Sequence, residues 1–553
     1  MKKSIQGILL FAALLFVANP AVGAVWYVDS LIGTSGDGTT WGTAFATIQE
    51  AIDAASAGDE AWVKAGTYTL SATINLDEEV SLYGGFAGAE TSREERDWET
   101  NVTTIDGNDA VRCLYVTADN VTIDGFTVTG GYTDGTVVEN GAAMQNGLYG
   151  GGEIDTTVAN CVFTDNHSGR HAGAIYNDEG NLALDNCVFA GNTASNRGGA
   201  ILSYSIHSNN ITNCEFTDNS GRSGGAMVIS DDSVSNTVTN TTFIGNTADT
   251  DGGAIVCDAD INITGCIFLE NIASRYGTIA TYADPGKTIA VVNSTFANNS
   301  VQYGGGVCIN GSSGELGAVI IKHCTFTGNT ATGDGGAVLS RKALGPTSVF
   351  LVSNSILWGD SGNEIAVIDN GELPTVIYSD VDQDGYEGSK GNIREDPLFV
   401  GVDDFHLAAG SPCVDMGTDA NVADDIDGDL RPLLTGFDMG ADEYTGACWD
   451  LDSDTYISEQ CGGDDCDDGN AGVNPGGVEE CGQATCSDGL DNDCDGLTDM
   501  GDPDCLEWCA YGTQASTIQT GRAYSTGPVN AMVILLVPLA GILFWKTTRR
   551  RRK

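Results

Sequence analysis

The sequence predicts an all-β fold in which the chain winds into a stack of similar coils. A Phe recurs at intervals of 25 to 30 residues, and an Asn follows it three positions later each time. The apolar stretches between them, such as NLALDNCVF and GGAILSYSI, are too short for helices and are bounded by turn residues. This period fits one coil of a three-stranded solenoid, whereas a propeller blade needs about 40 residues. The repeated positions are Phe163, Phe189, Phe216, Phe243, Phe268, Phe296 and Phe326, followed by Asn166, Asn192, Asn219, Asn246, Asn271, Asn299 and Asn329.

Each repeated residue type has an expected structural role, because stacked coils place equivalent residues about 4.8 Å apart. We expect the Phe side chains to form a buried column and the Asn side chains to hydrogen-bond along the stack. The Asn positions also tolerate left-handed backbone angles. Gly pairs such as Gly198-Gly199 fit sharp turns that leave no room for a Cβ atom. A Cys column is expected to be buried without disulfides; it contains Cys161, Cys187, Cys214, Cys266 and Cys324, with Thr241 and Ser294 in two coils.

The motif pair F-x-x-N and G-G-A-[IVL] resembles the polymorphic outer membrane protein repeat. The resemblance covers roughly residues 150 to 345 and implies a right-handed parallel β-helix of the pectate lyase type. Two coils depart from the pattern, with Ala172-Gly173 and Gly277-Thr278 in place of the Gly pair.

The N-terminal part is predicted to contain a signal peptide and a cap. Residues 1–24 have two Lys residues, an apolar run and a small-residue cleavage site, which is typical of secretion. Residues 25–110 then form the cap and first coils: WYVDS a strand, AFATIQEAIDAASAGD a helix ending at Gly58, and EAWVKAGTYTL the first coil. Two TIDG segments, ending at Gly107 and Gly125, indicate two further coils. The β-helix repeats follow over 111–352.

Residues 353–447 are interpreted as terminal β-helix coils. SNSILWGD, FHLAAGSPCVDMGTD, DIDGDLRP and DMGADEY occur here in an order that resembles the choice-of-anchor Q domain. That resemblance implies display at a surface and no catalytic residue. Asp380, Asp382 and Asp384 match the start of a calcium loop, but Gly391 occupies the position of the bidentate acid, so we prefer a turn.

Residues 448–509 are predicted to form a disulfide-linked, calcium-binding module. They contain eight of the 17 Cys residues, 18 acids and no Lys or Arg. DNDCDGLTDMGD has acids at positions 1, 3, 5, 9 and 12 of a calcium loop and Gly496 at position 6. A second loop begins DLDSD and must complete its ligands from GGDDCDDG; the alternative is a disulfide knot with solvated acids. The candidate ligands are Asp491, Asp493, Asp495, Asp499 and Asp502 in the first loop, and Asp450, Asp452, Asp454, Asp464 and Asp467 in the second.

This module also resembles the Asp/Cys-rich putative metal-binding module of bacterial surface proteins and is similar to thrombospondin type 3 calcium repeats. With Met500 as its only Met and no His, the segment favours a hard cation.

The C-terminus is predicted to anchor the protein in a membrane. After a linker over 510–528, residues 529–545 are an apolar run of 17 residues, and a basic tail ends the 529–553 segment. A helix of this length reaches roughly 25 Å, which is short but sufficient. The arrangement resembles bacterial C-terminal sorting signals, and it implies an exported protein at the cell surface or outer membrane.

Charge narrows the partners that this protein can have. Residues 25–528 contain all 77 acidic residues and only 16 of the 24 Lys and Arg residues. Their net charge is therefore −61. Such a body repels nucleic acid, so we expect partners among surface glycans or proteins of a host or neighbouring cell, bound by a monomeric solenoid.

One group of cations is the candidate catalytic or binding site. Arg170, Arg197, Arg222 and Arg275 each follow the repeat Asn by three to five residues and should form a rough column near His167 and His171. The competing interpretation is that these arginines pair with acids such as Asp165 and Asp218.

We therefore predict a structural or adhesive surface protein that binds a ligand or glycan and carries calcium. The alternative is a calcium-dependent polysaccharide lyase or glycan hydrolase acting on acidic polysaccharide, as the pectate lyase resemblance implies. The regular repeat favours the first role, because an active-site face usually interrupts several coils with long loops.

Overall fold

The computed structural model describes residues 23–445 with short gaps, together with Asn470, Val473 and Cys494. The gaps are 136–138, 149–150, 179, 205–207, 231–234, 283–285, 311–317, 342–348, 370 and 434. The chain divides into two compact units, Met1–Asp464 and Asp465–Lys553. The architecture below is that of the first unit.

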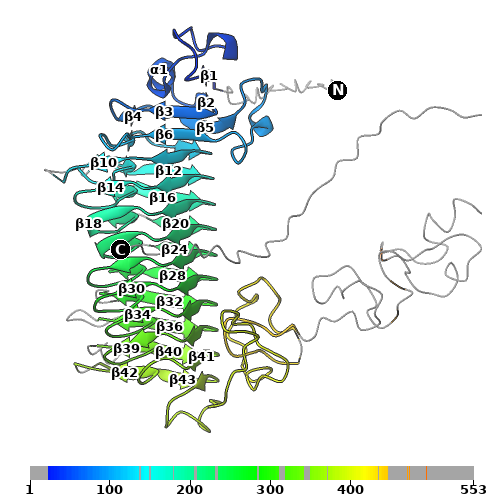
Figure 1. The fold of residues 1–553 in the computed structure, drawn as a ribbon. Helices are drawn as coiled ribbons and strands as arrows, with labels where there is room; N and C mark the ends of the chain where they lie inside the picture. Colours follow the sequence, from blue (N-terminus) through cyan, green and yellow to red (C-terminus); the bar gives the residue numbers. More distant parts are fainter. Residues whose placement is uncertain are drawn as a thin grey trace, which may run out of the picture. The chain divides into compact units, whose positions relative to one another are not determined.

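The first unit is built from four parallel sheets that run along a stack of coils (Figure 1). The first sheet contains β1 (Val25–Val28), β2 (Glu60–Lys64), β5 (Ser81–Phe86), β8 (Val121–Asp124), β12 (Ile154–Ala159), β16 (Gly180–Asp185), β20 (Asn209–Thr212), β24 (Asn236–Thr239), β28 (Ile261–Thr264), β32 (Thr288–Val292), β36 (Ala318–Lys322), β40 (Val349–Ser353) and β43 (Thr375–Ile377). The second contains β3 (Gly66–Thr69), β6 (Thr103–Asp106), β9 (Thr127–Thr129), β13 (Val162–Thr164), β17 (Val188–Ala190), β21 (Glu215–Thr217), β25 (Thr242–Ile244), β29 (Ile267–Leu269), β33 (Thr295–Ala297), β37 (Thr325–Thr327), β41 (Ile356–Trp358) and β44 (Asp380–Val381).

The other two sheets complete each coil. The third contains β4 (Ile74–Leu76), β7 (Leu114–Val116), β11 (Met144–Asn146), β15 (Ile175–Asp178), β19 (Ile201–Tyr204), β23 (Met227–Ile229), β27 (Ile255–Cys257), β31 (Ile279–Thr281), β35 (Val307–Ile309), β39 (Val338–Ser340) and β42 (Ile365–Val367). The fourth contains β10 (Tyr132–Thr133), β14 (His167–Ser168), β18 (Thr193–Arg197), β22 (Ser220–Ser223), β26 (Thr247–Ala248), β30 (Ile272–Ala273), β34 (Ser300–Val301) and β38 (Thr330–Ala331). From β8 to β39 the chain visits the first, second, fourth and third sheets in turn. The predicted solenoid is confirmed, but each of these coils has four strands instead of the expected three, because the turn after the repeat Asn also pairs as a short strand.

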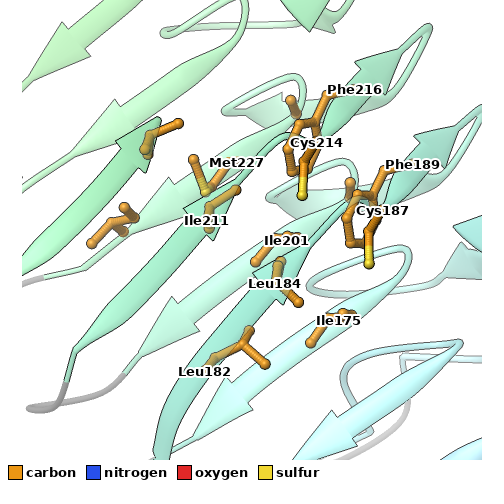
Figure 2. Close-up of a cluster of buried hydrophobic side chains, with 14 of the residues drawn as sticks. Ile175, Leu182, Leu184, Cys187, Phe189, Ile201, Ile211, Cys214, Phe216 and Met227 are labelled. Atoms are coloured by element: carbon orange, nitrogen blue, oxygen red, sulfur yellow. The ribbon is translucent and has the colours of Figure 1, made fainter. Parts of the chain in front are cut away.

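The buried Phe column is confirmed, because each repeat Phe pairs in register with its counterpart in the next coil. Successive rings stack with centroids 4.5 to 5.0 Å apart and lie within 9° of parallel. Figure 2 shows how Phe189 and Phe216 join Leu184, Ile201 and Met227 in the interior between the sheets. Stacking of identical side chains thus produces one elongated core that runs through all the coils, in contrast to the single central core of a globular domain.

The Asn side chains form the expected hydrogen-bond ladder in the interior. Each Nδ2 donates to the Oδ1 of the Asn one coil on, at 2.8 to 3.0 Å, from Asn166 to Asn329. The ladder ends on a carboxylate, since Asn329 Nδ2 donates to Asp360 Oδ1 at 2.9 Å. All seven Asn residues are buried, so these amides satisfy polar groups that would otherwise be costly inside the coil.

The expectation of left-handed angles at these Asn residues is wrong by one position. The residue before each Asn has the positive φ, between 54° and 64°, because the turn must be completed before the Asn side chain can point inward. These residues are Asp165, Gly191, Asp218, Gly245, Glu270, Asn298 and Gly328.

The Gly pairs occupy sharp turns, as expected. Gly198 has a φ of +68°, and a Cβ atom on Gly199 would lie 1.9 Å from the Gly225 carbonyl oxygen of the next coil. In the departing coil Ala172 adopts a φ of +55°, which an L side chain rarely does.

Replacing Gly199 with Ala is expected to destabilise the protein by about 1–3 kcal/mol or more, because backbone atoms leave its Cβ no space. Gly33, where a Cβ would meet nothing within 4 Å and φ is not in the left-handed region, provides a control without crowding. Denaturant unfolding of both Ala variants measures the difference. Equal losses would show that crowding between coils is unimportant.

The Cys column is confirmed as a column of buried thiols. Cys161, Cys187, Cys214, Cys266 and Cys324 are free and buried. Thr241 and Ser294 replace Cys within it and accept hydrogen bonds from the Cys214 and Cys266 backbone N–H groups. Burial raises the pKa of Cys161 and of Cys266 to about 12, so these thiols stay protonated and unreactive.

The N-terminal segment packs on the core through one short helix, α1 (Ile48–Ala54). Thr47 and Glu50 form a capping box at its start, and Ile48 and Ile52 are buried in the core. The predicted end at Gly58 is wrong, because the chain is already extended at Ala55 and must turn to reach β2. Two 3₁₀ turns, η1 (Trp41–Thr43) and η2 (Arg93–Glu95), lie in neighbouring loops. The two TIDG segments belong to consecutive coils but lie in different sheets, on β6 and β8.

After β44 the chain leaves the coils and folds back along the stack as irregular loops. The Ala441 N–H donates to Thr325 Oγ1 at 3.0 Å, and Asn354 exchanges two hydrogen bonds with Thr418. Arg431 is buried against Glu443 at 2.7 Å. The terminal segment is therefore held by backbone and side-chain polar contacts rather than by further strands.

Candidate anion-binding pocket

The structure brings two of the four candidate arginines into one pocket. Arg170 follows β14, Arg197 ends β18, and both line a cavity of about 530 Å³ on the outer side of the coils. His171 lies with them, as expected from the sequence. The remaining lining residues are Asn140, Gln145, Leu148, Tyr176, Asp178, Asn196, Leu202 and Tyr204.

Strand alternation explains how β15 and β19 supply the apolar and aromatic wall of the pocket. Ile175 and Ile201 pair in register and belong to the main core, whereas the next residues, Tyr176 and Leu202, belong to a separate apolar cluster. Tyr204 is 46% exposed. The wall therefore offers aromatic surface beside guanidinium groups.

The imidazole of His171 is neutral in this pocket. Burial lowers its pKa to about 4, and the charges of Arg170 and Arg197 act in the same direction. The Arg197 backbone N–H lies 3.4 Å from His171 Nδ1, which makes that nitrogen the acceptor and leaves Nε2 to carry the proton. The pocket thus combines two permanent cations with a neutral hydrogen-bond donor.

Arg275 and Arg222 lie outside the lining of this pocket, so the pocket contains two of the four arginines that were predicted to form a rough column. Arg275 makes a bidentate pair with Asp251, at 2.8 and 2.7 Å, and stacks over the Tyr276 ring. The Arg222 carbonyl oxygen accepts from Thr250 in the next coil. The number of residues between the repeat Asn and the Arg differs from coil to coil. Arg275 pairs with Asp251, whereas the sequence suggested acids such as Asp165 or Asp218 as partners of the arginines.

Sequence reasoning missed the aromatic and amide residues of the pocket. Tyr176 and Tyr204 carry no repeat signature, and Asn140 and Gln145 precede the first repeat Phe. Tyr176 follows the buried Ile175 in a strand of the third sheet, and this alternation of inward and outward side chains could have identified it as an outward residue. Gln145 is buried, and its side-chain amide nitrogen Nε2 donates a hydrogen bond to the Gly147 carbonyl oxygen at 3.3 Å.

The calcium predictions have separate outcomes. Arg394 pairs with both Asp382 and Asp384, which agrees with the preferred turn at this position. The ten Asp candidates of the 448–509 module lie outside the described residues. So do the signal peptide except for its last two residues, the linker and the C-terminal anchor. Among the residues that the structure describes, no helix is long and apolar enough to cross a bilayer.

A protein-family model supports the fold. Residues 112–370 match the family model of the right handed beta helix region. No curated protein matches the chain. The crystal structure of pectate lyase Pel9A aligns with 12% identity over 76% of this chain and 96% of its own, with a TM-score of 0.32. Together with the sheet order, the family match shows that this chain contains a right-handed parallel β-helix region.

Proposed function

We propose that the protein is a surface-displayed binding protein that holds an acidic saccharide in the pocket around Arg170 and Arg197. The observation that carries this proposal is the convergence of two arginines, a neutral His and tyrosine rings on one cavity. Guanidinium groups bind carboxylate or sulfate groups through paired N–H donors, and tyrosine rings present flat apolar surface to a sugar. A cavity of about 530 Å³ also lies within the usual range for small-ligand sites.

The pocket contains two positively charged side chains on a protein whose net charge is strongly negative. The chain has a net charge of −53, and Asp178 is the single acid among the described lining residues of the pocket. An anionic ligand is therefore repelled by the acidic body and attracted by the two arginines of the pocket. Export and membrane attachment, proposed from the two terminal segments, would display the pocket outside the cell. Calcium bound by the 448–509 module would stiffen the connection to the anchor.

The lining favours binding over catalysis. Calcium-dependent elimination needs several carboxylates to hold the ion beside the base, and the described lining supplies Asp178 alone. The cationic residues can neutralise a uronate, but a complete set of groups for bond cleavage does not converge there.

The Arg197→Ala variant is expected to bind an acidic polysaccharide about 10- to 100-fold more weakly than the wild type, because a charge-assisted hydrogen bond contributes about 1.5–3 kcal/mol. Arg170→Ala should behave similarly. Residues 25–528, with disulfides intact, are titrated with polygalacturonate, alginate and glycosaminoglycans by calorimetry, with calcium and with chelator.

Arg222→Ala is the matched control, because it removes the same charge one coil away and outside the pocket. Unsaturated product is followed by ultraviolet absorbance in the same samples. Calcium-dependent product that disappears in the Arg197 variant would replace this proposal with a lyase. Equal binding by the Arg197 and Arg222 variants would contradict the pocket.

A further inference from the structure

A second group of chemically active side chains lies in the terminal loops, away from the pocket. His406 follows Asp404 in one loop, and Asp427 lies in another. The second loop is held in shape by Asp425, whose Oδ1 accepts the backbone N–H groups of Asp427 and Asp429 at 2.9 and 2.8 Å. The fold therefore positions Asp427 beside a histidine 21 residues earlier in the chain.

The imidazole of His406 is bound on both sides by carboxylates. Its Nε2 lies 2.8 Å from Asp427 Oδ2, and its Nδ1 contacts Asp404 Oδ1. A nitrogen of His406, an oxygen of Asp427 and an oxygen of Asp442 all lie within 4.8 Å of one another. One nitrogen and two oxygen donors therefore converge from three segments, with a third carboxylate behind the ring.

Asp442 is the buried member of this group. Its residue is 7% exposed, and its hydrogen bond in the described structure is from the Leu407 backbone N–H, at 2.6 Å to Oδ2. Within the described residues, Asp442 makes no ion pair with Lys, Arg or His at the 4.0 Å contact distance. A buried carboxylate is costly unless a cation lies close to it, and a metal ion at the convergence point would be such a cation.

We propose that His406, Asp427 and Asp442 form a zinc site, with Asp404 orienting the imidazole. Mixed imidazole and carboxylate donors suit Zn²⁺, and three protein ligands leave one position open. A carboxylate that accepts from the distal ring nitrogen is the usual support of a zinc-bound His. The side chains of His406 and Asp427 are each 51% exposed, so the ion enters directly from solvent.

The test is zinc binding by the full chain, measured by equilibrium dialysis with ZnCl₂ alone. His406→Gln is expected to bind one zinc equivalent fewer than the wild type. His167→Gln is the matched control, because His167 is also exposed but contacts Thr193 Oγ1 in the coils. This control should retain the full stoichiometry. The comparison separates the site from any zinc held by the cysteines of the 448–509 module.

Two further variants keep the proposal open to refutation if His406→Gln disturbs the loops. Asp427→Asn preserves the shape of an exposed side chain and should lose the same equivalent. Asp404→Asn leaves all three ligands in place and should weaken binding at this site about 10- to 100-fold. If the His406 and Asp427 variants both bind zinc with wild-type stoichiometry and affinity, the proposal is wrong.

Discussion

Replacing Phe243 with Ala is expected to lower the free energy of unfolding of the β-helix by about 3–5 kcal/mol. The ring is fully buried and stacks between Phe216 and Phe268, with centroid distances of 4.9 and 4.8 Å. Its removal leaves a cavity that neighbouring coils cannot fill, because their backbones are hydrogen-bonded in register. Denaturant unfolding followed by circular dichroism measures the loss.

The loss should also be local, because each coil of a solenoid contacts its neighbours. Hydrogen exchange is expected to increase most in β21, β25 and β29 and least in coils at the ends. Ile267→Ala, at a side chain 39% exposed on the same strand as Phe268, is the control and should cost much less. A Phe243 variant that unfolds like the Ile267 variant would show that the Phe column adds little to stability.

The second large effect is a fall in stability as the pH rises from about 4 to about 7. Burial raises the pKa of Asp380 from 3.8 to about 7, although the Glu395 N–H and the Cys413 thiol donate to it. Burial raises the pKa of Asp438 to about 7 as well. A carboxyl whose pKa is raised by folding contributes fully below its unfolded pKa, and that contribution is lost as the pH rises through the folded pKa.

Each pKa unit corresponds to about 1.4 kcal/mol, so Asp380 alone accounts for a change on the order of 4 kcal/mol. Asp380→Asn keeps an acceptor for the Glu395 N–H and removes the titration. We expect this variant to melt at a higher temperature than the wild type at about pH 8 and to show a flatter pH profile. Asp382→Asn, two residues away and paired with Arg394, is the control. A wild-type melting temperature that rises over this pH range would contradict the prediction.

The repeat made most of the coil predictable from the sequence. Phe243 and Asn246 recur in a frame that the chain keeps for seven coils, and stacking leaves one place for each type: the ring in the core and the amide in the ladder. The Cys column could be predicted for the same reason, since a Thr and a Ser replace Cys in the series and no disulfide ladder could form there. These inferences needed the period alone, because an in-register stack converts sequence repetition directly into spatial columns.

The candidate sites could be predicted less well, because they depend on residues outside the repeat. The sequence places Arg170, Arg197, Arg222 and Arg275 in similar frames, yet the first two line one pocket and Arg275 is held by Asp251. Turn length changes by one or two residues between coils, which is enough to redirect a long side chain.

The sequence by itself determined the stacked all-β architecture and the Phe, Asn and Cys columns, since each follows from residue types repeated at a nearly fixed period. It also determined the extreme acidity, which follows from composition. The tertiary structure decided which cations face one another and brought His406 to Asp427 and Asp442. It also placed the left-handed angles one residue before the Asn ladder. The His406 group arises where irregular loops fold back on the coils, and contacts between segments far apart in the chain leave no periodic signal in the sequence.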